Sequence, residues 1–369
     1  MTSSTVYDQM HRAGMQAGLC TVAVCDAAPF VDVAGVLRRR RAAGLSGRLR
    51  FTFGHPERST SVRRSAPWAR CLVVAAVAYA PPGRAVTTEN GKGRVAAFAT
   101  VDSYRPLRRG LRAMAAVLAS AGYRTLLLAD DNRLVDRAAA VRAGIGWWGK
   151  STMVLAPGVG PWLLLGSVAT DAPLTPAEPM RRDCGTCDSC IPACPTGAIL
   201  SAGVLDASRC ISHWLQAPGV IPLPYRLAIG GRFYGCDECL RACPPGHRMR
   251  PASHSAEEPD MEWVLCVPGG ELLERFAHFY VPRRDPAHLR RNALIVLGNT
   301  GSRRHLRVVS SYLDDASSML RAHAVWAVAR LGATALLERH AGSESNPLVT
   351  LEYAHVSAGR VAARSGGGT

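Results

Sequence analysis

The spacing of apolar residues in the first half of the chain predicts a mixture of strands and helices. Apolar residues, three of them valines, fill 72–79 without interruption, which is typical of a buried strand. A second apolar run at 125–129 predicts another strand. Residues 104–121 carry apolar side chains every three or four positions, which predicts an amphipathic helix, and a shorter helix is expected over 134–143. The pattern therefore predicts an α+β fold.

The segment that follows is rich in glycine and tryptophan. Residues 146–151 read Gly-Trp-Trp-Gly-Lys-Ser, which we expect to form a glycine-rich turn. The apolar runs 152–155 and 162–168 flank a Pro-Gly pair at 157–158, so the pattern predicts two strands joined as a hairpin. Lys150 is one of two lysines in the chain, and it is either a phosphate contact or an ordinary surface lysine.

Two similar helical segments follow near the end of the chain. Residues 286–301 align with residues 317–332, which indicates a HEAT-like helical repeat somewhat shorter than the usual period. The alternative is two ordinary amphipathic helices. Basic residues gather here and are expected either to grip phosphates or to form a solvated face; they are Arg283, Arg284, Arg290, Arg291, Arg303, Arg304, His305 and Arg307.

Shifts in composition divide the chain into three predicted domains. A proline-rich linker at 171–183 separates a first domain, residues 1–172, from a cysteine-rich domain at 173–255. Residues 256–369 form the third predicted domain, and its tail at 364–369 is expected to be disordered.

The net charge of the chain indicates the kind of partner that it binds. The chain has 44 basic and 28 acidic residues and a formal net charge of +16. A polyanion is the expected partner, with RNA or DNA ahead of a membrane surface. No apolar run is long enough to span a membrane, and the N-terminus lacks the apolar core of a signal peptide. We therefore expect a cytoplasmic protein.

The cysteines carry the strongest chemical signal. Residues 184–195 read C-x-x-C-x-x-C-x-x-x-C-P, the bacterial ferredoxin run in which the fourth cysteine ligates the other cluster. A second set lies at 236–244, with Cys210 between. Eight thiolates suit two 4Fe–4S clusters, whereas structural zinc and disulfides fit the spacing poorly. The crossed sets are Cys184, Cys187, Cys190 and Cys243 for one cluster, and Cys194, Cys210, Cys236 and Cys239 for the other. The remaining four, Cys20, Cys25, Cys71 and Cys266, are expected to be buried thiols.

The order of these features resembles the epoxyqueuosine reductase family. The resemblance runs over about residues 10–340, and its most specific part is 142–150, RAGIGWWGK, beside the family's R-A-G-L-G-W-x-G-K. Residues 183–199 (DCGTCDSCIPACPTGAI), 209–212 (RCIS) and 234–239 (YGCDEC) extend the match.

The resemblance implies a function and a set of partners. It implies reduction of epoxyqueuosine to queuosine in tRNA, with electrons relayed by two 4Fe–4S clusters to cobalamin. The three predicted domains then become an α+β cobalamin-binding domain, a ferredoxin-like domain and a HEAT-like domain. The implied partners of the monomer are the tRNA anticodon arm and a flavodoxin or ferredoxin as electron donor. Two alternatives stay open: another cobalamin and iron–sulfur reductase, dehalogenase-like, or a non-catalytic iron–sulfur carrier that binds RNA.

The resemblance also assigns individual site residues. Counting back from Gly146 of the tryptophan motif, the family's catalytic acid falls on Asp130, which follows the predicted strand at 125–129. Asp131 is the alternative if the register slips by one. Read without the family, the pair is a strand-end turn or a helix N-cap. The resemblance implies that Asp130, Val154, Leu165 and Ser212 contact the cobalamin.

Three segments depart from the family pattern. Arg133 stands where the family has a proline after the aspartate, residues 101–104 read VDSY instead of R-D-Y-H, and residues 213–217 also differ. These segments line the cofactor and the modified base in the family, so the exact substrate stays open at the level of sequence.

Overall fold

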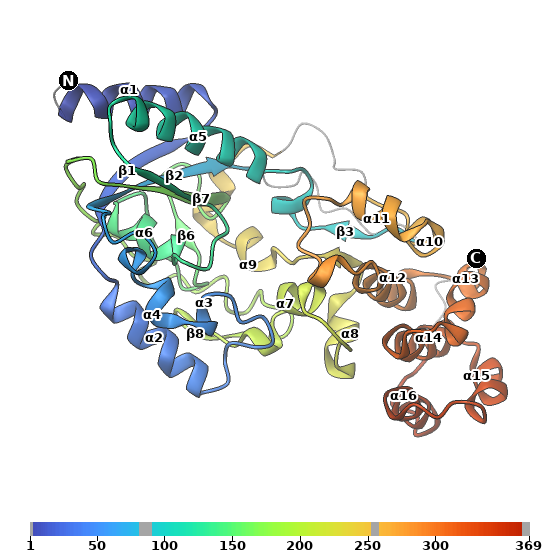
Figure 1. Ribbon diagram of the computed structural model, residues 1–369. Coiled ribbons are helices and arrows are strands. Elements are labelled where there is room, and N and C mark those ends of the chain that lie inside the picture. The colour runs from blue at the N-terminus through green and yellow to red at the C-terminus, as the bar shows by residue number, and fades with distance from the viewer. Residues whose placement is uncertain (1–2, 81–90, 252–257, 364–369) are drawn as a thin grey trace. The chain divides into compact units, whose positions relative to one another are not determined.

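The computed structural model describes residues 3–80, 91–251 and 258–363 (Figure 1). The chain divides into two compact units that interleave along the sequence. The first unit comprises Met1–Gly83, Thr100–Cys210 and Asp237–Ser253, and the second comprises Arg84–Ala99, Ile211–Cys236 and His254–Thr369. The predicted disordered tail at 364–369 and the predicted domain boundary after residue 255 lie outside the described residues. The division into three domains stays a prediction.

An antiparallel sheet forms the centre of the first unit. Its strand order is β1-β2-β7-β4. The predicted strand at 72–79 is confirmed as a central strand, and its continuous apolar run is explained by neighbours on both edges and helices on both faces. The strands are β1 (Thr21–Asp26), β2 (Cys71–Ala78), β4 (Thr125–Leu128) and β7 (Leu163–Thr170).

Helices cover both faces of this sheet. On one face, α1 (Ser3–Gln16) and α5 (Tyr104–Ser120) pack together, and side chains such as Leu111 and Met114 are fully buried there (Figure 1). On the other face, α6 (Asp136–Arg142) contributes three alanines to a second core. The helix predicted at 134–143 begins later than expected, because residues 131–135 form a loop tied by hydrogen bonds.

The predicted hairpin of 152–155 with 162–168 is wrong. β6 (Val154–Leu155) pairs with β5 (Trp147–Trp148), while β7 lies between β2 and β4 in the main sheet. A tight turn, closed by the Gly149 amide on the Met153 carbonyl at 2.8 Å, makes the local pairing possible. The other elements of this unit are α2 (Val31–Ala42), α3 (Phe51–Gly54), α4 (Pro56–Ser59), β8 (Ile199–Ser201), β9 (Val204–Leu205) and α9 (Glu238–Arg241).

The second unit is mainly helical. Its longest helices, α12 (Ala287–Thr300) and α14 (Ser318–Arg330), coincide with the two similar segments of the sequence and pack against each other. Gly298 permits the close approach, because a Cβ there would lie 2.3 Å from the Trp326 ring. The other elements are β3 (Arg94–Val95), α7 (Ile211–Gln216), α8 (Leu223–Ile229), β10 (Arg232–Tyr234), α10 (Met261–Cys266), α11 (Gly269–Arg275), α13 (Leu306–Ser310), α15 (Thr334–Ala341) and α16 (Pro347–Ser357).

Buried polar side chains tie these helices together. The buried Arg226 of α8 forms an ion pair with Glu352 of α16. His323 of α14 is fully buried; its Nε2 accepts a hydrogen bond from the Ile221 amide at 3.2 Å, and its Nδ1 donates to the Met319 carbonyl at 2.7 Å. Burial holds the pKa of His323 well below its usual range, so the imidazole is neutral. Within the described residues, no helix is both long and apolar enough to cross a membrane.

Candidate iron–sulfur and catalytic site

Four of the predicted ligands gather in the first unit. Cys243 packs beside Cys184 although they are far apart in sequence. Burial, with smaller contributions from the nearby thiols of Cys184, Cys190 and Cys187, raises the pKa of Cys243 to about 11. Burial also raises the pKa of Cys190, again with help from Cys184 and Cys187. The thiols of Cys184, Cys187 and Cys190 thus lie close enough to Cys243 to affect its ionisation.

The loop that carries the first three thiols is held by backbone hydrogen bonds. The Gly185 amide donates to the Asp183 carboxylate at 2.7 Å. Lys150 donates its Nζ proton to the Gly185 carbonyl at 2.8 Å, so this lysine fixes the cysteine loop. That contact was missed by both sequence interpretations of Lys150. Cys187 is exposed, and a hydrogen bond with Ser189 lowers its thiol pKa.

The second set is spread over two segments of the chain. The β8–β9 hairpin returns the chain from Cys194 toward Cys210, through a hydrogen bond from the Asp206 amide to the Ala198 carbonyl at 2.8 Å. Burial opposes ionisation of Cys194, but backbone amides outweigh it and lower the pKa of its thiol. Cys236 ends a segment of the second unit, directly before the first-unit segment that holds Cys239.

The four remaining cysteines divide evenly. Cys25 and Cys71 are buried as expected, and burial raises their thiol pKa values to about 12 and about 11. The prediction that Cys20 and Cys266 are buried is wrong, since both are exposed. Cys20 precedes an edge strand, and Cys266 ends a short helix. In the described part of the chain, no three Cys, His, Asp or Glu side chains converge as the ligands of a single ion must.

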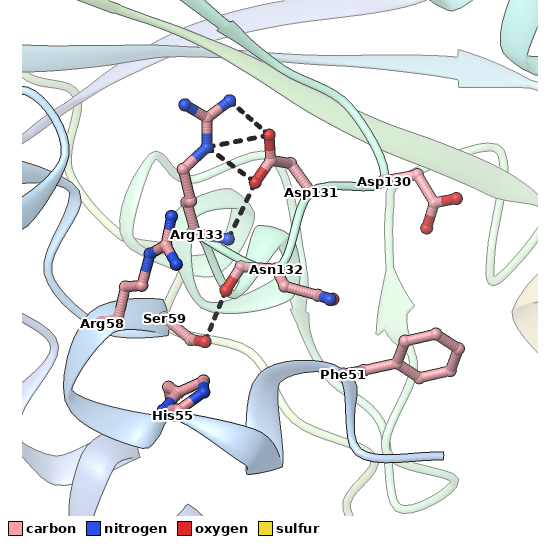
Figure 2. Close-up of a pocket in the computed structure, with 8 residues that line it drawn as sticks. All are labelled: Phe51, His55, Arg58, Ser59, Asp130, Asp131, Asn132 and Arg133. Carbon is pink, nitrogen blue, oxygen red and sulfur yellow. Dashed lines mark hydrogen bonds and ion pairs between the residues drawn. The ribbon is translucent and has the colours of Figure 1, made fainter.

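A polar cavity lies at the end of β4. It has a volume of about 330 Å³. One wall comes from the loop after β4 and the other from α3 and α4, as Figure 2 shows. Its lining residues are Phe51, His55, Arg58, Ser59, Asp130, Asp131, Asn132 and Arg133. The wall from residues 51–59 was missed by the sequence analysis, because nothing in that stretch marks its proximity to the aspartates.

The two adjacent aspartates have different surroundings. Asp131 accepts hydrogen bonds from the Arg133 Nε at 2.9 and 3.0 Å, and this pairing lowers the pKa of its carboxyl. Asp130 points away from that pair (Figure 2) and makes no hydrogen bond or ion pair with the described residues. Burial raises the pKa of Asp130, opposed by Arg108 and reinforced by Asp131. Asp131 is therefore held ionised, while Asp130 is the better proton donor.

The backbone around Asp130 is unusual. Asp130 has a φ of 55°, a left-handed conformation that aspartate tolerates better than most residues. The loop is anchored at Ser59, whose hydroxyl donates to the Asn132 carbonyl at 2.5 Å and whose carbonyl accepts from the Val135 amide at 2.9 Å. Such a conformation persists only where surrounding contacts hold it, and it is frequent at functional sites.

The other predicted cofactor contacts fall in different places. Leu165 is half-buried on β7, and Asp130 follows β4, the strand that pairs with β7. Val154 has a buried side chain, 2% exposed, in the core beneath the sheet. Ser212 lies on α7 of the second unit and accepts a hydrogen bond from Gln216 at 3.1 Å. The structure brings Asp130 and Leu165 to one end of the sheet, and the roles of all four residues stay predictions.

The fold and the cysteine segment define a two-cluster iron–sulfur protein. Residues 183–246 match the family model described as a 4Fe-4S double cluster binding domain. Among curated relatives, the epoxyqueuosine reductase of Bacillus anthracis is 35% identical over 213 residues, which cover 56% of each chain. The epoxyqueuosine reductase of Xanthomonas campestris pv. campestris is 32% identical over 80% of this chain and 88% of the relative. This chain therefore belongs to the epoxyqueuosine reductase family.

Solved structures agree over a longer span. A selenomethionine-labelled epoxyqueuosine reductase superposes with a TM-score of 0.87 at 28% identity, covering 96% of this chain and 99% of the other. An epoxyqueuosine reductase with an epoxyqueuosine-modified tRNA stem loop gives a TM-score of 0.85 at 26% identity, covering 96% and 98%. By sequence, the chain spans just over half the length of the first curated relatives it matches.

Proposed function

We propose that this protein reduces epoxyqueuosine to queuosine in tRNA. The proposal is carried by the contrast at the aspartate pair in a chain of this family: the pKa of Asp130 is raised although the residue is exposed, whereas Asp131 pairs with Arg133 and its pKa is lowered. A Bacillus subtilis relative is described with an aspartate-bearing catalytic loop swung out of the active site, which fits a role for the loop after β4. A tRNA substrate would place the protein in the cytoplasm.

The proposed cluster ligands are the two crossed sets. Cys184, Cys187, Cys190 and Cys243 hold the first cluster; their shared surroundings support this assignment. Cys194, Cys210, Cys236 and Cys239 hold the second, and each set provides the four thiolates that one cubane needs. A thiol must lose its proton to bind iron, so the raised pKa values of Cys190 and Cys243 imply that cluster assembly releases protons there.

The proposed cofactor is cobalamin. When bound, it supplies the low-potential electrons for removal of the epoxide oxygen, which no side chain can supply. The residues proposed to hold it are Asp130, Val154, Leu165 and Ser212. The open end of the main sheet beside Asp130 and Leu165 fits a site for a large group, because solvent reaches both side chains. The buried side chain of Val154 leaves its backbone as the contacting part.

Asp130 is proposed as the proton donor. Opening an epoxide leaves an oxyanion, which must gain a proton from an acid within hydrogen-bond reach. A carboxyl whose pKa is raised keeps a larger protonated fraction near neutral pH, and burial does this for Asp130. Arg133 lowers the pKa of Asp131 and makes that carboxyl a poor donor. The same arginine closes the loop from Asp131, so it also helps to fix the position of Asp130.

The matched variants Asp130→Asn and Asp131→Asn test this assignment. Asp130→Asn keeps the size of the side chain but has no acidic proton, so turnover of epoxyqueuosine-containing tRNA should fall by about 100- to 10,000-fold. Iron, sulfide and bound cobalamin should stay at wild-type levels. Asp131→Asn should lose much less turnover. If Asp131→Asn abolishes turnover and Asp130→Asn does not, the acid is Asp131. Wild-type rates in both variants would show that neither aspartate of this loop is the acid.

The helical unit is proposed to hold the tRNA anticodon arm as a HEAT-like repeat. Its exposed basic residues include Arg303, Arg304 and Arg307 around α13. The expectation that Arg291 grips a phosphate is wrong, because this residue is fully buried and donates to backbone carbonyls. Contacts to phosphates release counterions, so tRNA affinity should fall steeply with salt.

A charge-reversal pair tests this surface. Arg303→Glu with Arg307→Glu should weaken tRNA binding and flatten its salt dependence, because two phosphate contacts are lost. The control is Arg339→Glu with Arg360→Glu, which makes the same change in charge at exposed positions of the same unit. Binding would be measured by filter retention at several salt concentrations. Equal losses of tRNA affinity in both double variants would show that the effect comes from net charge and not from contacts at Arg303 and Arg307.

The electron donor is proposed to be an acidic carrier such as a flavodoxin or ferredoxin. Cys187 is exposed, so the first cluster would lie near the surface. Two arginines, Arg182 and Arg248, line a cavity of about 250 Å³ beside the segment that follows Cys243. Opposite charges speed the encounter of redox partners. Glu substitutions at these two arginines should slow reduction by an acidic donor but not by dithionite.

A further inference from the structure

The indole N–H group of Trp147 is a buried hydrogen-bond donor that has no acceptor among the described residues. Trp147 lies on β5 and is 7% exposed. It belongs to a small core with Leu155 and Cys243, and Met180 and Cys184 pack against this core. Its Nε1 atom is buried, and within the described part of the chain it has no hydrogen-bond acceptor. A buried donor without an acceptor costs about 1–3 kcal/mol, so its persistence implies an acceptor that the polypeptide itself does not provide.

The position of the ring is fixed by the backbone. Gly146 precedes it in such close contact with β6 that a Cβ at this glycine would lie 2.1 Å from the Leu155 carbonyl oxygen. The Arg182 guanidinium lies 5.0 Å from the centre of the Trp147 ring. The indole therefore has little freedom to turn toward another partner. By contrast, the buried Trp162 donates its Nε1 proton to the Gly246 carbonyl at 3.1 Å.

The residues around Trp147 limit which group can accept the hydrogen bond from its indole. A buried water needs several polar partners, and the neighbours of Trp147 in this core are apolar side chains and thiols. The ring also borders the cavity that contains Arg182 and Arg248, but these side chains are donors. The remaining acceptor is the group proposed to sit on Cys184 and Cys243. Sulfurs of a 4Fe–4S cluster carry negative charge and accept hydrogen bonds, which tune the reduction potential.

We propose that the Trp147 Nε1–H group donates a hydrogen bond to a sulfur of the first cluster and raises the reduction potential of that cluster. This inference rests on the proposed ligand set of Cys184, Cys187, Cys190 and Cys243. Reduction adds one electron from the carrier to the cluster, and the hydrogen bond stabilises the added negative charge. Trp147 is thus a tuning residue in electron entry and does not touch the substrate.

The variant Trp147→Phe removes the donor and keeps an aromatic ring. Its matched control is Trp148→Phe, because Trp148 is the adjacent residue on the same strand and is 42% exposed. Midpoint potentials of both clusters would be measured by titration with dithionite, followed by electron paramagnetic resonance. In Trp147→Phe, one of the two midpoints should become more negative, and at a fixed potential the reduced-to-oxidised ratio of that cluster should fall by about tenfold, the size expected for one charge-assisted hydrogen bond. The other midpoint should not move, and Trp148→Phe should shift neither.

A second measurement needs no variant. Electron–nuclear double resonance on the reduced wild-type protein should show an exchangeable proton coupled to the first cluster, and the signal should disappear in deuterium oxide. Unchanged midpoints in Trp147→Phe, or no exchangeable coupled proton in the wild type, would overturn the inference. Iron and sulfide contents too low for two clusters would overturn it together with the ligand sets. Neither readout depends on turnover, so inactivity on epoxyqueuosine-containing tRNA would refute the proposed function alone.

Discussion

Replacing Arg291 by methionine should destabilise the second unit, although the sequence places this arginine in a basic cluster. Its guanidinium donates to the carbonyls of Ala217 at 2.7 Å, Gly219 at 2.6 Å and Trp214 at 3.0 Å. These carbonyls lie at or just beyond the C-terminal end of α7, where helical carbonyls lack partners. Arg291 therefore joins α12 to the segment that carries Ser212.

The expected magnitude follows from these bonds. Each buried carbonyl left without a donor costs about 1–3 kcal/mol, which gives about 3–9 kcal/mol for three. Removing a buried charge also relieves its desolvation cost, so we expect the free energy of unfolding to fall by an amount near the lower end of this range, about 3 kcal/mol. At about 2–4 °C per kcal/mol for a unit of this size, the melting temperature should fall by about 6–12 °C.

The assay is thermal unfolding followed by circular dichroism, with Arg303→Met as the control. Arg303 is exposed, and a surface substitution of this kind should change stability by no more than about 0.5 kcal/mol. Limited proteolysis should cut the Arg291→Met protein faster near α7. Suppose that the melting temperature of the Arg291→Met protein stays within 2 °C (about 1 kcal/mol) of the wild type while its tRNA binding weakens. This result would refute the structural role and would indicate that Arg291 contacts tRNA.

Three further predictions concern the thiols, Gly146 and pH. In apoprotein treated with iodoacetamide, Cys187 should react fast, because it is exposed and its pKa is lowered, whereas Cys25, with a pKa of about 12, should stay unmodified; bound clusters should protect Cys187, and mass spectrometry would detect both outcomes. Gly146→Ala should abolish soluble folded protein or sharply lower its melting temperature, since the added Cβ would meet the Leu155 carbonyl at 2.1 Å; a normal melting curve would contradict this. Because folding lowers the pKa of His323, this histidine contributes to the stability of the protein above about pH 6.5, and the contribution is lost as pH falls below that value. Melting temperatures measured between pH 5 and 8 should show this decline. In the His323→Gln protein the melting temperature should depend less on pH.

Local patterns predicted those features that depend on neighbours in sequence. The apolar run of β2 and the helical spacing of α5 were confirmed, because burial on two faces or on one stripe leaves a direct trace in residue order. The cysteine run likewise indicated the two-cluster segment, since cluster ligation requires thiolates at fixed short spacings. The hairpin across residues 157–158 was predicted wrongly, because the pairing of β7 is decided by the distant strands β2 and β4.

The sequence by itself therefore determined the class of chemistry, through eight cysteines in a ferredoxin-like order and a strongly basic chain. Only the tertiary structure decided which charged residues are available for that chemistry. Arg133 pairs with Asp131 and lowers the pKa of its carboxyl, and carbonyls more than seventy residues away along the chain hold the guanidinium of Arg291 in the interior. The physical reason is that burial and pairing set the charge and reach of a side chain, and its partners come from segments that only the folded chain brings together.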